Sequence, residues 1–415
     1  MRIKRIAILA LVATLALGNV FAQKTELNFW TWRPEDTEKY QALLASFEKQ
    51  NPGVTVKISA FKNTEYNTIL SAALAGGSGP DVFQSRAYGG LETFAQSGYL
   101  EPLDAWVPEL KGFDKAPLGG ATSIKDGKVY GVPFASQTLF VFYNKAIYKE
   151  LGLKVPETWD QFLANLAACK KAGYQALANG GKEGWTLEVM MGSLAPNFYG
   201  ANDFFQAVVA GKTNFQDPRF KGAMDKLKEL TPYMPDLFMG VSYTDMQASF
   251  INEMAAHFVG GSFEAGYFSS QNPKLDFGIF AGPVAKAGDP RHVSVYADGN
   301  FSMNSGSKKK DAAAKLLKFF ASKETGNFFI NELKQVSAVP GADTSKSPYI
   351  KEVLSLQKFN TPYIFLVGFR YNQPTGSALF QSAAQGFFAG TLSSADLCKQ
   401  IQDGIATYYA PFQKK

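Results

Sequence analysis

Residues 126–145, DGKVYGVPFASQTLFVFYNK, contain the strand around which we expect the fold to be built. Asp126 and Gly127 form a two-residue turn signal, and the run that follows Pro133 is mostly apolar. Gln137 is the one amide within this run. A buried amide needs hydrogen-bond partners, which either the protein or a ligand supplies. The strand therefore leaves two alternatives for Gln137, a structural amide or a ligand-binding amide.

Toward the N-terminus of this stretch, strand and helix patterns alternate. Strand patterns occur at 26–31, 54–61 and 81–85, and helical periodicity occurs between them at 36–50 and 63–77. Asn-Pro-Gly ends the first helix, and glycines end the second. Strands and helices that alternate with short connections predict an α/β fold with a mostly parallel sheet covered by helices.

Beyond residue 145 a second set of elements follows. Thr158 and Gln161 have the spacing of a capping box at the start of a helix, and helical patterns continue to about residue 260. A strand is expected at 276–283, a strand and a helix at 294–326, and a break at 337–343 before a helical C-terminus. The length favours two domains, and the lack of a low-complexity linker favours lobes that share several chain crossings.

The N-terminus has the pattern of a secretory signal peptide over residues 1–22. A basic start precedes an apolar run at 6–17, and small residues precede a cut before Gln23. An uncleaved anchor is the alternative, although the run is short for a membrane span. No cysteine lies near the cut, so we expect no lipid anchor. We expect a mature protein in the periplasm.

Charge and composition exclude several classes of partner. The net charge of +6 falls to +3 without residues 1–22, and no basic block suggests nucleic acid. Cys169 and Cys398 lie on apolar helix stripes, which leaves open two buried free thiols or a disulfide. His257 and His292 are far apart in sequence, so we expect no metal site and no cofactor.

An ordered set of motifs resembles a known family. The motifs are LNFWTW (27–32), LAGGSGPDVFQSRAYGGLETFAQSGYLEPLDAW (74–106), DGKVYGVPF (126–134), YNK (143–145), LGLKVPETWDQF (151–162) and GGSFEAG (260–266). Together they resemble the extracellular solute-binding proteins of ABC importers, of the carbohydrate-uptake, maltose-binding-like type. The resemblance covers essentially the whole chain after residue 22, and the order of the motifs is more specific than any one of them.

The resemblance implies a periplasmic-binding-protein fold of two α/β lobes. Each lobe has a mostly parallel sheet covered by helices, and the ligand lies in the cleft between the lobes. Multiple hinge crossings join them, and these are expected near 136–141, 279–284 and 336–341. The implied division is lobe 1 at 23–137 and 284–337 and lobe 2 at 138–283 and 338–415. Gln137 would then lie on the first crossing and direct its amide into the cleft.

Five candidate ligand-binding residues of the first lobe follow strands. Ligands of parallel α/β sheets bind at the carboxyl ends of the strands, which here carry Trp32, Arg33, Ser85, Arg86 and Tyr88. Trp32 is the preferred stacking plate, since Trp30 lies within the strand. Arg86 could bind vicinal hydroxyls or a sugar acid group, and a surface ion pair is its alternative.

The other candidates lie in glycine-rich or C-terminal segments. Trp185 stands in a glycine-flanked loop, and Phe263 and Glu264 belong to GGSFEAG, where the family often has tryptophan. Phenylalanine keeps the stacking face and loses the indole N–H donor. The last candidates are Asp298, Gly299, Asn300, Arg370 and Tyr371. A turn would explain Asp298, Gly299 and Asn300 equally well.

These features predict a periplasmic binding protein that captures a mono- or oligosaccharide by hinge closure. We expect a monomer without catalytic activity that delivers its sugar to a membrane ABC permease. One rival is a secreted glycoside hydrolase or lyase that uses a carboxylate pair such as Asp298 and Glu264. The other rival is a binding protein for a peptide, polyamine or phosphate ester.

Overall fold

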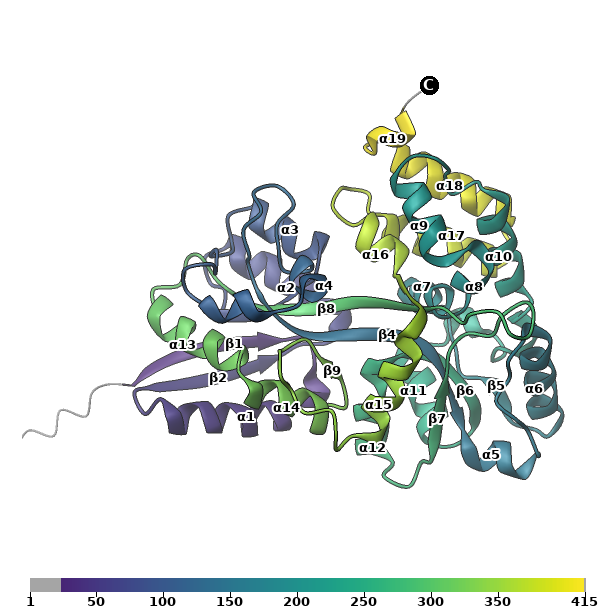
Figure 1. The fold of residues 1–415 in the computed structure, drawn as a ribbon, viewed down its shortest axis with the longest axis horizontal. Coiled ribbons are helices and arrows are strands. Elements are labelled where there is room, and N and C mark those ends of the chain that lie inside the picture. The colour runs from purple at the N-terminus through teal and green to yellow at the C-terminus, as the bar shows by residue number, and fades with distance from the viewer. Residues whose placement is uncertain (1–23, 414–415) are drawn as a thin grey trace, which may run out of the picture.

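The computed structural model describes residues 24–413, so the signal peptide expected at 1–22 lies outside the described residues. An N-terminal and a C-terminal lobe lie side by side and are joined by two long strands, β4 (Val132–Asn144) and β8 (Val293–Met303) (Figure 1). Within residues 24–413, no helix is both long and apolar enough to cross a membrane. The expected two-lobe α/β architecture is confirmed.

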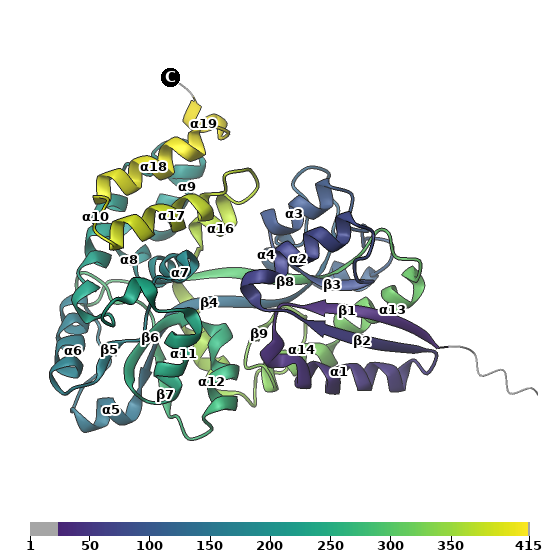
Figure 2. The ribbon, with the colours of Figure 1, turned by 180° about the vertical axis from the view of Figure 1, so that it is seen from behind.

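The N-terminal lobe begins with the predicted strand-helix alternation. β1 (Thr25–Thr31) lies between β2 (Val54–Ala60) and β3 (Val82–Arg86) and pairs parallel with both. The helices of this lobe are α1 (Thr37–Gln50), α2 (Asn63–Ala75), α3 (Gly89–Gln96), α4 (Lys115–Gly119), α13 (Lys310–Phe320) and α14 (Lys323–Asn331). Figure 2 shows α2, α3 and α4 on one side of the sheet and α1 and α14 on the other. The sheet is therefore covered on both faces.

Strand β4 changes partners as it passes from one lobe to the other. Its first part, up to Thr138, pairs antiparallel with β8, and its second part pairs from Leu139 onward with β6 (Ala255–Gly261) and β7 (Phe277–Phe280). The order across the sheet is β2-β1-β3-β8-β4-β6-β5. The predicted first crossing near 136–141 thus coincides with the change of partner.

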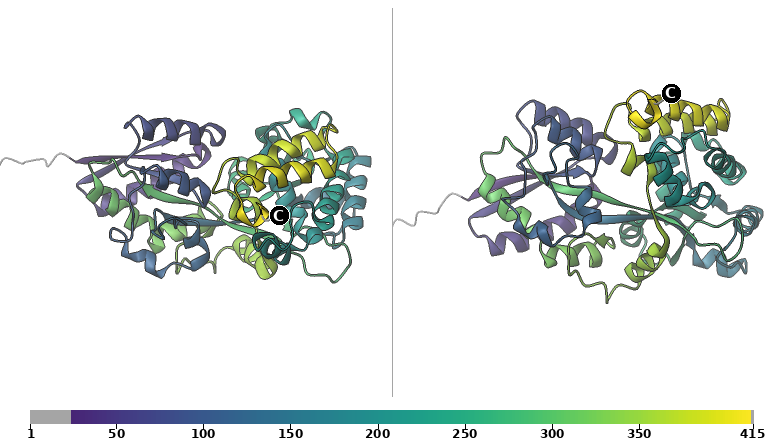
Figure 3. Two further views of the ribbon diagram at one scale, coloured as in Figure 1. Left: turned by 90° about the horizontal axis from the view of Figure 1, so that it is seen from above. Right: turned by 45° about the horizontal axis from the view of Figure 1, so that its top comes forward.

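The C-terminal lobe is the more helical of the two. Its short strands are β5 (Gln175–Leu177), which pairs parallel with β6, and β10 (Asn360–Pro362), which pairs parallel with β8. Its helices are α5 (Lys145–Glu150), α6 (Trp159–Lys171), α7 (Gly184–Leu194), α8 (Pro196–Tyr199), α9 (Ala201–Val209), α10 (Pro218–Lys228), α11 (Tyr243–Ile251), α12 (Ala265–Gln271), α15 (Pro348–Leu356), α16 (Ile364–Gly368), α17 (Gly376–Phe388), α18 (Ser394–Ala406) and α19 (Ala410–Gln413). Both views of Figure 3 show α17 and α18 as an outer layer of this lobe.

Local signals in the sequence explain individual element starts. The capping box of Thr158 and Gln161 is present at the start of α6, as predicted from the spacing. Gly127 has φ +72° in the turn after Asp126, a backbone conformation that glycine adopts without strain. That turn closes an isolated bridge between Thr122 and Val129, so it precedes β4 without forming a hairpin between two full strands.

The return crossing differs in position from the expectation. The chain returns along β8, and residues 284–292, which we expected in lobe 1, are bonded to the C-terminal lobe: Val284 bridges Thr158, and the His292 backbone N–H donates to Asn197 Oδ1. The glycine and proline at 282–283 end β7 without leaving the lobe. The third connection runs through β9 (Val336–Ser337), which pairs with β4, and on to α15.

The sheet is also more mixed than expected. Parallel pairing holds for β1 with β2 and β3 and for β5 with β6, whereas β4 pairs antiparallel with β6, β7, β8 and β9. The reason is that β4 and β8 run in opposite directions between the lobes, so each brings antiparallel neighbours into both halves of the sheet.

Both cysteines are buried and free, so no disulfide joins Cys169 and Cys398. Burial raises the pKa of the Cys169 thiol to about 11 and that of Cys398 to about 12. Thiols with such pKa values are poorly reactive at neutral pH. The two cysteines therefore serve as small apolar core residues.

Candidate functional site

Among the contacts that join the lobes outside the crossing strands, two involve predicted site residues. Arg33 of the N-terminal lobe donates from Nη2 to the backbone oxygen of Phe263 in the C-terminal lobe, with an N···O distance of 3.4 Å. Gly89, at the start of α3, lies so close to Arg370 that a Cβ at position 89 would be 1.8 Å from the Arg370 carbonyl oxygen. We call the residues at and around these contacts the interlobe face: Trp32, Arg33, Arg86, Tyr88, Gly89, Trp185, Phe263, Glu264, Tyr296, Asp298 and Arg370.

Trp32 lies under Arg86 and is 2% exposed. The Arg86 guanidinium carbon is 3.8 Å from the centre of the indole ring, and Arg86 also donates from Nη2 to Asn63 Oδ1. On another side Gly299 approaches the ring, since a Cβ there would be 2.5 Å from the indole Cη2. In this arrangement Trp32 supports Arg86 and is itself almost fully covered.

Arg33 is held by two acids of its own lobe. Its Nε donates to the Asp36 carboxylate, and its Nη2 is 3.3 Å from Glu35 Oε1. Both Arg33 and Asp36 are buried, so either charge without the other would be costly. The contact to Phe263 uses a donor that remains after these pairs are made, so Arg33 acts as a link between lobes.

Three candidates lie inside the N-terminal lobe. Ser85 Oγ is 2.8 Å from Ser302 Oγ, and the Asn300 amide donates to the Gly120 carbonyl at 3.1 Å. Ser85 and Asn300 are both 0% exposed and are paired with each other across β3 and β8. Ser85 and Asn300 therefore pack in the lobe interior, and Gly299 serves close packing against Trp32.

Gln137 is fully buried and hydrogen-bonded on both ends of its amide. Its Nε2 donates to Asp298 Oδ2 at 3.1 Å and to Gln335 Oε1 at 2.9 Å, and its Oε1 accepts from Ser262 Oγ at 2.6 Å. Asp298 lies on β8, and Gln335 directly precedes β9. The Gln137 amide thus ties all three connections between the lobes together, which answers the question raised by its place in an apolar strand.

Tyr88 extends from the N-terminal lobe to the returning strand. Its hydroxyl accepts from the Ala297 backbone N–H at 3.0 Å, and its ring packs against the core of the C-terminal lobe. Tyr88 has φ 58° immediately before α3, a conformation that is unusual for a residue other than glycine. The bond to Ala297 holds this conformation and fixes where α3 begins.

Trp185 and Phe263 line a small cavity in the C-terminal wall of the interlobe face. Trp185, near the start of α7, meets Tyr243 edge to face with ring centroids 4.6 Å apart. The other lining residues are Thr186, Val189, Met246, Phe258, Val259, Gly260 and Glu264. The cavity measures about 10 Å³, roughly the space of one water. A sugar therefore needs the lobes or these rings to move before it can enter.

Glu264 lies behind Phe263 and is 1% exposed. Burial raises the pKa of Glu264 to about 7, although hydrogen bonds from Gln247 and Tyr243 and the charge of Arg33 act in the opposite direction. Gln247 Nε2 and Tyr243 Oη each donate to its carboxylate at 2.8 Å. The carboxylate oxygens are therefore already occupied by protein donors.

Arg370 follows α16 and lies opposite the N-terminal lobe. Burial lowers the pKa of Arg86 and raises that of Glu188, and the charge of Arg370 lowers both, so Arg370 acts on each of these groups. Glu188 is 3% exposed and accepts hydrogen bonds from Ser377 Oγ and Gln381 Nε2. Burial raises the pKa of Tyr371 to about 12. The C-terminal wall thus presents arginine and tyrosine side by side.

Five residues at or beneath the interlobe face were absent from our expectation: Glu188, Tyr243, Gln247, Tyr296 and Gln335. They lie inside apolar helices or strands or immediately before a strand, and they follow no glycine-rich turn. A buried carboxylate or amide inside an apolar run, such as Glu188 in GWTLEVMMGSL, is the signal that could have found them. Gln137 is the one such residue that we singled out.

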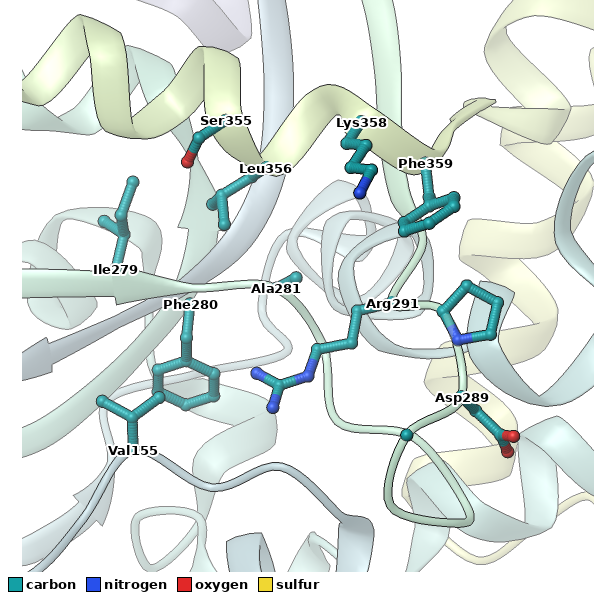
Figure 4. Close-up of a pocket in the computed structure, with 12 residues that line it drawn as sticks. Val155, Ile279, Phe280, Ala281, Asp289, Arg291, Ser355, Leu356, Lys358 and Phe359 are labelled. Atoms are coloured by element: carbon teal, nitrogen blue, oxygen red, sulfur yellow. The ribbon is translucent and has the colours of Figure 1, made fainter.

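A larger hollow lies elsewhere, on the C-terminal lobe alone. It measures about 630 Å³ and is formed by β7, the loop before β8 and the segment after α15. Figure 4 shows the Arg291 side chain pointing across this hollow and Phe359 at its edge. None of the predicted site residues lines it, so size alone does not identify the candidate site.

The geometry gives little support to catalysis by a carboxylate pair or to a metal site. Asp298 is hydrogen-bonded to Gln137, and Glu264 to Gln247 and Tyr243, so neither carboxylate of the suggested pair is free of protein partners. Over residues 24–413, no three His, Cys, Asp or Glu side chains are grouped so as to hold a metal ion. The interlobe face combines aromatic rings with fixed polar groups, which suits the faces and hydroxyls of a sugar.

The chain is similar in sequence to several known proteins. The sequence profile of the family described as bacterial extracellular solute-binding protein matches residues 32–327. A multiple sugar-binding protein of Streptococcus mutans is 25% identical over 402 residues, which cover 94% of this chain and 91% of the relative. A maltotriose-binding protein of Pyrococcus abyssi is 25% identical over 360 residues, 81% of this chain and 69% of that protein.

A solved structure has the same fold. The bacterial solute receptor AcbH, described with an exclusive preference for β-D-galactopyranose, superposes with a TM-score of 0.81 at 21% sequence identity. The match covers 93% of this chain and 100% of that one. At this identity the likeness concerns the fold, including both lobes and the strands between them.

Proposed function

The chain belongs to the family of bacterial extracellular solute-binding proteins, and on that premise we propose that it captures a mono- or oligosaccharide between its lobes. The bound sugar is then delivered to a membrane ABC permease. The observation that carries this proposal is the interlobe face, where Arg33 of one lobe contacts Phe263 of the other and Phe263 lines a small cavity together with Trp185. Names of relatives that cover most of the chain support a sugar as the ligand.

Hinge closure is the mechanism by which this geometry would hold a sugar. Both lobes contribute groups to the interlobe face, so a ligand makes more contacts when the lobes are together than when they are apart. Only such a difference in affinity shifts the population toward the closed form. The Gln137 network joins the three connections at one place, which confines the motion to a hinge.

We assign ligand contact first to Trp185, Phe263, Arg86, Arg370, Asp298 and Tyr371. Trp185 and Phe263 would stack on the sugar, and the two arginines and Asp298 would bind its oxygens. Arg33, Gln137, Glu264 and Tyr88 would position these groups. Trp32, Ser85, Gly299 and Asn300 would shape the wall from within the lobe.

The protein's role in transport would require no catalysis of its own, no cofactor and no nucleic acid. We propose a monomer in the periplasm, exported by the segment at 1–22. A secreted carbohydrate-active enzyme is the rival reading, and incubation of the purified protein with the sugar that binds best, followed by product analysis, separates the two. Turnover of that sugar would refute the assignment as a binding protein.

Thermal denaturation of purified protein against a panel of ligands tests the proposal. A ligand at about 100 times its Kd adds roughly 2.7 kcal/mol to stability, which raises Tm measurably. We expect at least one mono- or oligosaccharide to raise Tm. A shift with a peptide, polyamine or phosphate ester, together with none for any sugar, would assign the protein to another solute.

A further inference from the structure

Arg86 and Arg370 belong to opposite lobes and lie on either side of a close approach at Gly89 and Gly90. A Cβ at 89 would be 1.8 Å from the Arg370 carbonyl oxygen, and a Cβ at 90 would be 2.5 Å from Arg86 Cβ. Arg86 ends β3 in the N-terminal lobe, and Arg370 follows α16 in the C-terminal lobe. Within residues 24–413, Arg33 and Arg219 form salt bridges, whereas no Asp or Glu oxygen lies within 4.0 Å of the guanidinium of Arg86 or Arg370. Both arginines are half-buried, so water screens their charges less than at the surface.

The charges of the two arginines act on each other. Burial lowers the pKa of Arg86 to about 10; the charge of Asp298 opposes this effect, and the charge of Arg370, the smaller of the two, adds to it. Burial raises the pKa of Tyr296, which pairs with Gln137 of β4 and packs on Tyr363, and both arginines act against that shift. Repulsion between the two cations disfavours closure, Asp298 offsets it at Arg86, and an anion bound between the arginines would favour closure further.

Arg86 is also held in a fixed orientation. Its guanidinium lies over the Trp32 ring, and its Nη2 is bound to Asn63. The remaining N–H donors of the planar group are therefore presented in one direction. A guanidinium held in this way favours a planar partner with two oxygens, which a carboxylate provides.

We propose that the sugar captured by this protein is acidic, and that its carboxylate lies between Arg86 and Arg370. The inference rests on the proposed function, which it deepens by naming uronic acids and their oligosaccharides as the ligand class. A single negative charge fits the surroundings, because Asp298 and Glu188 already act on the two arginines. A doubly charged phosphate would meet more repulsion from these acids.

Binding of a carboxylate between Arg86 and Arg370 would also favour closure of the lobes. With the lobes apart, the carboxylate can pair only with the arginine of one lobe. With the lobes together it pairs with both and removes their repulsion, so its affinity for the closed form is higher. A neutral sugar lacks this difference and would close the lobes through its rings and hydroxyls alone.

Isothermal titration with matched sugars tests the proposal. The probes are galacturonate and glucuronate, their di- and trisaccharides, and the neutral galactose and glucose compounds of equal length. We expect the acidic member of at least one pair to bind roughly 10- to 100-fold more tightly, as for one charge-assisted contact. Raising NaCl from 0.05 to 0.5 M should weaken the acidic sugar selectively.

Substitutions of Arg86 and Arg370 test whether the sugar carboxylate binds between these two residues. Arg370→Gln and Arg86→Gln should each remove most of the preference for the acidic sugar, so that the acidic sugar and its neutral partner bind with similar affinity. Arg86→Lys keeps the charge and removes the planar fork, so it should restore only part of the preference. Arg291→Gln is the matched control, because Arg291 is also without a salt bridge among residues 24–413 but lies in the hollow of Figure 4.

Different results would contradict the preference for an acidic sugar and the sugar-binding function itself. Equal affinity for acidic and neutral sugars, unaffected by Arg86→Gln and Arg370→Gln, would overturn the inference and leave a sugar-binding protein. Tighter binding of a sugar phosphate than of any uronate would overturn the choice of carboxylate. Binding of neither class of sugar would refute the proposed function itself. Unfolding curves of the unliganded variants identify any that fail to fold.

Discussion

Gln137 and Gln335, 198 residues apart, are joined by a hydrogen bond of 2.9 Å between their side-chain amides. The bond connects strand β4, where the chain first passes between the lobes, to the segment just before β9, where it passes for the last time. Asp298 on β8 shares the same amide. A single polar side chain in an apolar strand is thus explained by the meeting of three connections at one point.

Replacing Gln137 by leucine should destabilise the unliganded protein by about 2–4 kcal/mol. The change removes three hydrogen bonds and leaves the buried Gln335 and Ser262 without this partner. Urea unfolding measures the loss. Gln357→Leu is the control, since Gln357 makes one partly buried bond to Thr138, the next residue along the strand. Equal small losses in both variants would show that the network contributes little.

Gly89→Ala should weaken ligand binding and leave the unliganded protein almost as stable as before. A Cβ at 89 would clash with the Arg370 carbonyl only when the lobes are together. Overpacking of this kind costs roughly 1–3 kcal/mol, so Kd should rise about 5- to 150-fold.

The matched control for Gly89→Ala is Gly119→Ala. Gly119 lies in the same lobe, and a Cβ there meets nothing within 4 Å. Titration of both variants with the best sugar makes the comparison. A Kd for Gly89→Ala equal to that of the control would mean that binding does not require this contact.

Trp185→Ala should raise Kd for the sugar about tenfold or more, whereas Trp185→Phe should keep most of the affinity. The indole lines the small cavity in the C-terminal lobe and is half-buried against Tyr243, so its ring is available for stacking with modest rearrangement. Trp106→Ala, at a partly buried indole bound to Glu101, is the control. If both tryptophan-to-alanine variants bind alike, Trp185 is part of the core and not of the site.

Glu264→Gln should change how stability depends on pH. Between pH 4.5 and about 7 the unfolded chain has released the Glu264 proton and the folded protein keeps it, because burial raises the pKa in the folded state. The folded state therefore binds more protons, and stability falls as the pH rises through this window. Above pH 7 the cost is complete, at roughly 3 kcal/mol.

The measurement is the free energy of unfolding of both proteins at pH 4.5, 6 and 8. The Glu264→Gln protein lacks this proton, so its stability relative to the parent should grow by roughly 3 kcal/mol from pH 4.5 to 8. Glu38→Gln, on the exposed side of α1, is the control. A constant difference across the three pH values would mean that Glu264 ionises in the folded protein as it does in the unfolded chain.

Patterns of short range predicted the fold well. The periodicities of 26–85 correspond to β1, α1, β2, α2 and β3, and the spacing of Thr158 and Gln161 corresponds to the capped start of α6. Such patterns depend on neighbours a few residues away, and the same residues decide both the pattern and the element. We predicted the return crossing near 279–284, whereas the chain returns along β8. Gly282 and Pro283 show that a strand ends there, but they do not show which lobe the next residues join.

The candidate site was less predictable because each side chain there is decided by distant partners. Trp32 does follow a strand at the expected edge of the sheet, but Arg86 and Gly299 cover it. Arg33 stands at the same edge and is held by Asp36 and Glu35 before it contacts Phe263. Glu188 was missed because its one signal, a carboxylate within an apolar helix, was passed over, and Tyr296 was missed because nothing in its own segment marks it.

Hydrophobic period, caps and ordered motifs are properties of adjacent residues, so they were enough to predict most elements, the two-lobe class and the family. Which polar groups bond within the protein and which face the space between the lobes is visible only in the folded molecule. A buried donor or charge pairs with whichever partner lies within about 3 Å, and that partner is often remote in the chain: the hydroxyls of Ser85 and Ser302 are 2.8 Å apart although the residues are 217 positions apart.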